Sequence, residues 1–184
     1  MAVLAVAIAM LVWPHAGGSV IERAIGTGAA ARPEFPTIDQ ALDPTRTRIL
    51  TVARDQYASN PPGTTFAQGE VQPWCADFIS STMRTAGIPF ANPNSGSWRI
   101  PGVGTLTDYF RSTGRWRAPG HRPQPGDVVL YDVPSPLRQH TNLVAAMQGD
   151  QVTTVGGNEP QGVTLRTFAF GAEPGIQGYG VPPA

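Results

Sequence analysis

The residue best suited to nucleophilic chemistry is Cys75, the single cysteine of the sequence. One cysteine forms neither an intramolecular disulfide nor a zinc site of several cysteines, so its thiol is either an inert core group or a reactive one. Apolar residues follow it at helical spacing as far as Ala86, and Gly87 stands where a helix cap would fall. The pattern predicts Cys75 at a helix start, where N–H groups and the helix dipole favour a thiolate.

A reactive cysteine needs a base, and three histidines compete for that role. His15 lies in the apolar N-terminal segment, and His121 lies in a run of proline and glycine that is typical of turns. His140 directly precedes residues 141–144, whose composition is typical of a strand. A strand would hold the imidazole rigidly, so we expect His140 to be the base; the alternative is a surface histidine at a strand edge.

Four short motifs around these residues occur in a fixed order. They are Trp74-Cys75-Ala76-Asp77-Phe78, Pro125-Gly126-Asp127-Val128-Val129, His140-Thr-Asn-Leu-Val144 and Gly156-Gly157-Asn158. In this order they resemble the motifs of the CHAP family, the cysteine, histidine-dependent amidohydrolases/peptidases, over roughly residues 42–182. The resemblance implies a papain-like fold related to the NlpC peptidases. It also implies bacterial peptidoglycan as the substrate and no metal or cofactor.

Carried over by position, the resemblance implies Cys75 as nucleophile, His140 as base and Asn158 as the residue that orients the imidazole. Many family members carry a glutamate two positions before that asparagine, where this sequence has Gly156. Glu159 is adjacent, but neighbouring residues of an extended segment point to opposite faces. We therefore expect Glu159 not to replace the missing acid.

Three further residues are candidates for substrate binding: Trp74, Trp98 and Gln72. Trp74 either forms a wall of the cleft or anchors the helix start to the core. Trp98 lies in a loop of Ser, Gly and Asn, and Gln72 is a candidate second donor to an oxyanion beside the Cys75 backbone N–H. Asp77, an acid at the helix start, is expected to be structural because it complements the dipole.

The composition predicts one globular domain. The sequence is 41% hydrophobic and 14% charged, and its formal net charge is zero, which disfavours a nucleic-acid partner. Residues 1–17 contain an apolar run of signal-peptide length, followed by a Gly/Ala/Pro-rich linker over 18–41 and the catalytic domain over 42–184. The apolar run predicts a secreted or envelope protein of a bacterium, and an uncleaved run would be a membrane tether.

The remaining pattern predicts an α+β fold, with N-terminal helices packed on a C-terminal antiparallel β-sheet. Helical spacing extends from residue 37 to about residue 59, from Cys75 to Ala86, and around residues 105–112. Segments rich in β-branched or aromatic residues then predict strands at 128–131, 143–147, 151–155 and 163–168, with an irregular break at 156–160.

These expectations together predict a peptidoglycan hydrolase that cleaves an amide bond through a thioester on Cys75. The enzyme would be either an N-acetylmuramoyl-L-alanine amidase, which cleaves the amide between muramic acid and L-alanine, or an endopeptidase, which cleaves a peptide bond of the stem or cross-link. Two alternatives remain open. One is a non-catalytic wall-binding or scaffold protein, which the missing acid at Gly156 favours, and the other is an exported amidase effector or toxin.

Overall fold

The computed structural model describes residues 32–183. The apolar segment predicted over 1–17 and residues 18–31 of the predicted linker lie outside the described residues. Within the rest of that linker, Phe35 and Ile38 pack against the hydrophobic core, and the carbonyl of Pro33 accepts a hydrogen bond from the Tyr57 hydroxyl at 2.6 Å. In the part of the chain that the structure describes, no helix is long and apolar enough to cross a membrane.

The helices precede the main strands and have clear local causes. Helix α1, Pro44–Ser59, begins where the Asp43 side chain accepts hydrogen bonds from two backbone N–H groups, and it ends at the left-handed residue Asn60. It therefore starts later than the spacing from residue 37 predicts. The others are α2 (Gly63–Phe66), α3 (Cys75–Thr85) and α4 (Val103–Ser112).

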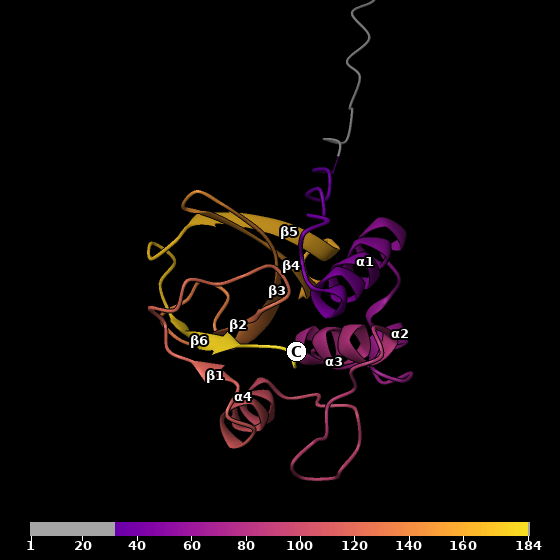
Figure 1. Cartoon of the computed structure of the whole chain (residues 1–184). Coiled ribbons are helices and arrows are strands. Elements are labelled where there is room, and N and C mark those ends of the chain that lie inside the picture. The colour runs from indigo at the N-terminus through magenta and orange to yellow at the C-terminus, as the bar shows by residue number, and fades with distance from the viewer. Residues whose placement is uncertain (1–31, 184) are drawn as a thin grey trace, which may run out of the picture. The chain divides into compact units, whose positions relative to one another are not determined.

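The described strands form one antiparallel sheet in the order β1-β6-β2-β3-β4-β5. Their bounds are β1 Trp116–Arg117, β2 Val128–Tyr131, β3 His140–Gln148, β4 Gln151–Glu159, β5 Gly162–Ala169 and β6 Ile176–Gly180. Figure 1 shows α1, α2 and α3 grouped on one side of the sheet, with α4 beside β1. The predicted α+β architecture is confirmed.

Both faces of the central strands are buried. Alternate residues such as Leu143 and Val155 join the core beneath α1 and α3, whereas Val144 and Val152 join a second cluster on the opposite face. This two-sided burial explains why β2 is a continuous apolar run without alternation. The central strands are therefore packed on both sides.

The sheet differs from the prediction in three places. Strand β4 continues through the break predicted at 156–160, because its pairing with β5 resumes after a shift in register. Strand β1 has two residues, and β6 has glycine at two of its five positions, so both lack a strong strand pattern. Strand β6 nevertheless lies inside the sheet, between β1 and β2.

Candidate active site

Cys75 is the first residue of α3, as the sequence predicts, and its side chain is buried. The preceding residue, Trp74, stacks on Phe66 with ring centroids 5.2 Å apart and planes at 6°. Its indole also lies against Gly63 and Gly157, where an added Cβ would approach ring atoms to 2.3 Å. Two glycines thus make room for the indole that anchors the nucleophile's helix to the core.

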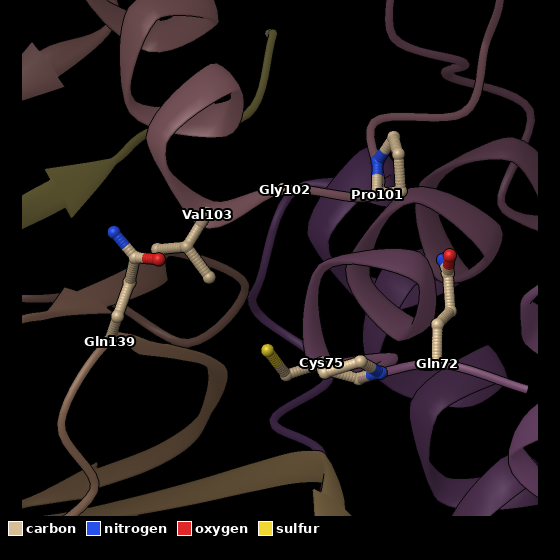
Figure 2. Close-up of a pocket in the computed structure, with 7 residues that line it drawn as sticks. Gln72, Cys75, Pro101, Gly102, Val103 and Gln139 are labelled. Carbon is tan, nitrogen blue, oxygen red and sulfur yellow. The ribbon is translucent and has the colours of Figure 1, made fainter.

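The thiol opens onto a cavity of about 330 Å³. Besides Cys75, the cavity is lined by Gln72, Pro73, Pro101, Gly102, Val103 and Gln139. Figure 2 shows the sulfur of Cys75 pointing from the helix toward the side of the cavity formed by Val103 and Gln139. A substrate in this cavity would lie directly against the thiol.

His140 is the first residue of β3 and follows the cavity residue Gln139. Its buried imidazole interacts with Cys75 and faces Glu159. Burial alone lowers the pKa of His140, but its interactions with Cys75 and Glu159 outweigh burial and raise that pKa to about 9. The imidazole is therefore protonated at neutral pH.

Glu159 supplies the carboxylate on the other side of the imidazole. Its Oε1 lies 3.5 Å from Nε2 of His140, and both side chains are only 7% exposed. Oε1 also accepts a hydrogen bond from Nδ2 of Asn142 at 3.2 Å, and Oε2 accepts one from the Thr164 hydroxyl. Burial raises the pKa of Glu159, but the ion pair with His140 and the hydrogen bonds from Thr164 and Asn142 hold that pKa below its usual value. The site thus holds a buried, oppositely charged pair.

The expectation that Glu159 points away from the site is wrong, and a bulge in β4 is the reason. Gly156 pairs with Thr164 and Glu159 pairs with Gly162, so β4 carries one residue more than β5 between these two pairs. Asn158, with a φ of 63°, lies within this bulge. The extra residue reverses the alternation, and Glu159 shares a face with Gly156.

Gly156 leaves the space that this arrangement needs. A Cβ at Gly156 would lie 1.9 Å from Oδ1 of Asn142 and 2.9 Å from Oε1 of Glu159. The space beside Gly156, where a side-chain acid was expected, is therefore occupied by the side chains of Glu159 and Asn142. Asparagine tolerates the left-handed conformation better than most residues, so Asn158 after two glycines is the sequence signal for such a bulge.

The remaining predicted site residues have separate locations. Gln72 lines the cavity of Cys75, whereas Asn158 is exposed and lines a neighbouring cavity that also includes Trp74 and Gln72. Trp98 packs against Arg84, whose guanidinium carbon lies 4.4 Å from the centroid of the Trp98 ring.

Sequence reasoning did not identify the cavity residues 101–103 and Gln139, which carry no motif of their own. Within residues 32–183 no group of three or more His, Cys, Asp or Glu is placed to hold a metal ion.

Comparison with solved structures supports the fold. The chain is similar to the crystal structure of Ly7917, with a TM-score of 0.52 at 17% identity, over 75% of this chain and 62% of that one. A second structure, of Ly7917 with the hydrolyzing product of MDP, gives a TM-score of 0.50 at 17% identity over 76% and 63%. The chain thus spans less than two thirds of the length of these solved chains, and the likeness concerns the fold alone.

Sequence comparison identifies the family. No curated protein sequence matches the chain. The sequence model of the CHAP domain matches residues 67–158, which are 92 of the 184 residues and include Cys75, His140 and the bulge of β4. Because this match covers half of its length, the chain belongs to the CHAP domain family.

Proposed function

We propose that this protein is a peptidoglycan hydrolase that cleaves an amide bond through a thioester on Cys75. The observation that carries the proposal is the sequence of contacts from Cys75 to His140 and from His140 to Glu159, at the wall of an open cavity. A thiol, an imidazole and an orienting acid in that order are the groups that cysteine acyl transfer requires.

The chemistry begins with the imidazolium of His140 beside Cys75, which reacts in its thiolate form. The thiolate attacks the amide carbonyl carbon, and His140 gives its proton to the departing amine as the C–N bond breaks. The neutral imidazole then removes a proton from water, which attacks the thioester and releases the carboxylic acid. The C–S bond breaks and releases the thiolate of Cys75, while His140 keeps the proton that it took from water, so both groups return to their starting state.

Two groups would support the negative oxygen of the tetrahedral intermediate. The backbone N–H of Cys75 belongs to the first turn of α3, where N–H groups have no partner within the helix. Gln72 offers a side-chain amide in the same cavity. Removal of one such donor typically lowers the rate by about 10²–10³.

Glu159 acts on the imidazole and does not contact the reacting atoms. Its carboxylate stabilises the imidazolium and holds the ring so that its other nitrogen serves Cys75. The case for a non-catalytic scaffold depended on the missing acid at Gly156. Because the carboxylate of Glu159 lies beside Gly156 and faces His140, an acid is present after all, and its presence favours an enzyme over a scaffold.

Peptidoglycan as the substrate is supported by the family and by the related fold that holds the hydrolyzing product of MDP. Peptidoglycan lies outside the cytoplasmic membrane, which agrees with export through the apolar N-terminal segment. The proposal therefore includes peptidoglycan as the substrate and export of the protein. It also includes the bond that is cleaved, either the muramoyl–alanine amide or a peptide bond of the stem or cross-link.

Digestion of purified cell wall tests the proposal. Wild-type protein and the Cys75→Ala variant are incubated with the wall, and the soluble fragments are analysed by mass spectrometry. Fragments with free lactyl groups would indicate an amidase, and new peptide ends would indicate an endopeptidase. Equal release by Cys75→Ala, with folding verified by circular dichroism, would contradict the thioester mechanism, and no release by wild type would contradict the substrate.

A further inference from the structure

A second buried charge pair adjoins the nucleophile. Asp77 lies two residues after Cys75 in the first turn of α3, and its side chain is fully buried. Its Oδ1 accepts a hydrogen bond from Nε of Arg99 at 2.6 Å, and its Oδ2 accepts one from Nε2 of Gln72 at 2.7 Å. Nη2 of Arg99 also contacts Oδ2 at 3.3 Å. A side chain that only complemented the helix dipole would not need these partners.

The two partners of Asp77 lead to two different parts of the cavity. Gln72 is itself a lining residue, and Arg99 is followed closely by the lining residues Pro101, Gly102 and Val103. Figure 2 shows Pro101, Gly102 and Val103 above Cys75, with Gln72 beside it on the side of Pro101 and Val103 toward Gln139. The carboxylate of Asp77 is therefore bonded directly to Gln72 in one part of the cavity wall. Through Arg99 it is also bonded to the segment that supplies residues 101–103 to the next part.

A neighbouring contact fixes the same segment to the same helix. Ser80, one helical turn after Asp77, is fully buried, and its hydroxyl accepts a hydrogen bond from the backbone N–H of Ile100 at 3.1 Å. The same hydroxyl lies 3.2 Å from the carbonyl of Ile100. The backbone that enters the cavity wall is thus held by two polar residues of α3 that lie one helical turn apart, Asp77 and Ser80.

The energetics of a buried ion pair suggest a role beyond stability. Burying two charges costs desolvation energy that their attraction only partly offsets, so a well-packed apolar pair often serves stability equally well. An ion pair does, however, restrict its partners to one geometry, because the forked guanidinium matches the carboxylate in few orientations. Such restriction matters most where a wall must stand at a set distance from a nucleophile.

We propose that Asp77 is a positioning residue that, through Arg99 and Gln72, sets the shape of the cavity over Cys75 and holds the Gln72 amide for the substrate's acyl oxygen. The role of the amide rests on the proposed hydrolase function, whereas the shape of the cavity does not. Nε2 of Gln72 carries two hydrogens, so donation to Asp77 leaves one for a substrate.

Three variants test the proposal: Asp77→Asn, Arg99→Lys and Gln72→Ala. One measurement is kcat and KM on soluble cell-wall fragments. The other is the rate at which Cys75 reacts with iodoacetamide and with a bulky iodoacetamide derivative, which needs no substrate. We expect Asp77→Asn and Arg99→Lys to lower kcat by about tenfold to a hundredfold and to change the ratio of the two alkylation rates. The double variant Gln72→Ala/Asp77→Asn should be no slower than Asp77→Asn, because the amide has already lost its alignment.

A matched control comes from another ion pair with a buried carboxylate, that of Asp127 and Arg46. Asp127 is fully buried and bonds to Nη2 of Arg46 at 2.9 Å, and neither residue lines the cavity of Cys75. Asp127→Asn should therefore lower the melting temperature while leaving kcat and the alkylation ratio of the folded protein at wild-type values. The comparison separates an effect on cavity shape from a general loss of stability.

The proposal is overturned if Asp77→Asn behaves like Asp127→Asn, with a lower melting temperature but an unchanged kcat and alkylation ratio. If Asp77→Asn does not fold, Arg99→Lys and Gln72→Ala decide, and wild-type kcat in both would also overturn it. If the wild type cleaves no cell wall, the hydrolase proposal fails. The alkylation ratio then still tests the shape of the cavity, and an unchanged ratio in Arg99→Lys overturns that part.

Discussion

The carboxylate of Glu159 meets the imidazole of His140 inside the protein, with Oε1 of Glu159 3.5 Å from Nε2 of His140. His140 begins β3 and Glu159 ends the adjacent strand β4, so the meeting depends on how the two strands pair. The bulge at Asn158 turns Glu159 to the face of Gly156, where a side chain on residue 156 would collide with it.

The first prediction separates Glu159 from Asn158 as the residue that orients the imidazole. Glu159→Gln keeps the shape of the side chain but removes the charge beside the imidazolium, so we expect kcat to fall by at least about tenfold. Asn158→Gly removes the side chain and retains the left-handed backbone, so we expect a much smaller loss. Steady-state hydrolysis of cell-wall fragments ranks the two variants. The opposite ranking would assign the orienting role to Asn158, the position of the family motif.

The second prediction concerns activity at alkaline pH. The pKa of His140 is raised to about 9, and the leaving amine takes its proton from the imidazolium. We therefore expect kcat to stay level through neutral pH and to fall as the pH rises through about 9. Weakening the charge beside His140 in Glu159→Gln should move this limb to lower pH. A limb at the same pH in both proteins would show that another group is titrating.

The third prediction concerns stability and pH. The pKa of His140 in the folded protein, about 9, is above its usual value of 6.5, so its interactions stabilise the fold fully below about pH 6.5 and less as the pH rises through 9. The melting temperature of wild type should exceed that of His140→Ala by a margin that shrinks between about pH 6 and pH 10. Calorimetry at a series of pH values measures the margin. A margin that is constant or grows would contradict the raised pKa.

The fourth prediction concerns the glycine that accommodates Trp74. An added Cβ at Gly157 would lie 2.3 Å from Cζ3 of Trp74 and 2.8 Å from Cβ of Phe78. Gly157→Ala should therefore lower the free energy of unfolding by about 1–3 kcal/mol, as overpacking a core does. Urea denaturation gives this free energy.

Gly104→Ala is the matched control for that substitution. Gly104 lies in α4, and an added Cβ there would meet no atom within 4 Å. Alanine favours the helix over glycine, so the free energy of unfolding should rise by up to about 1 kcal/mol. If Gly157→Ala were as stable as Gly104→Ala, the close packing of Trp74 on β4 would be disproved.

Local signals in the sequence determined the main elements of this protein and the location of its candidate dyad. Helical spacing predicts α3 from Cys75, and β-branched runs predict β2 through β5, because both patterns arise from neighbours along the chain. The order of helices and strands was sufficient for the α+β class. The motifs also identified His140 as the candidate base, although its role stays a prediction.

Only the tertiary structure decided which acid reaches His140 and what surrounds Cys75. The orientation of Glu159 depends on one extra residue in the pairing of β4 with β5, and a shift of one residue reverses the face of every side chain that follows. The contact of Arg99 with Asp77 likewise joins a loop to a helix 22 positions earlier. Spacing along the chain records neither relationship, because each depends on contacts that form only when the whole domain packs.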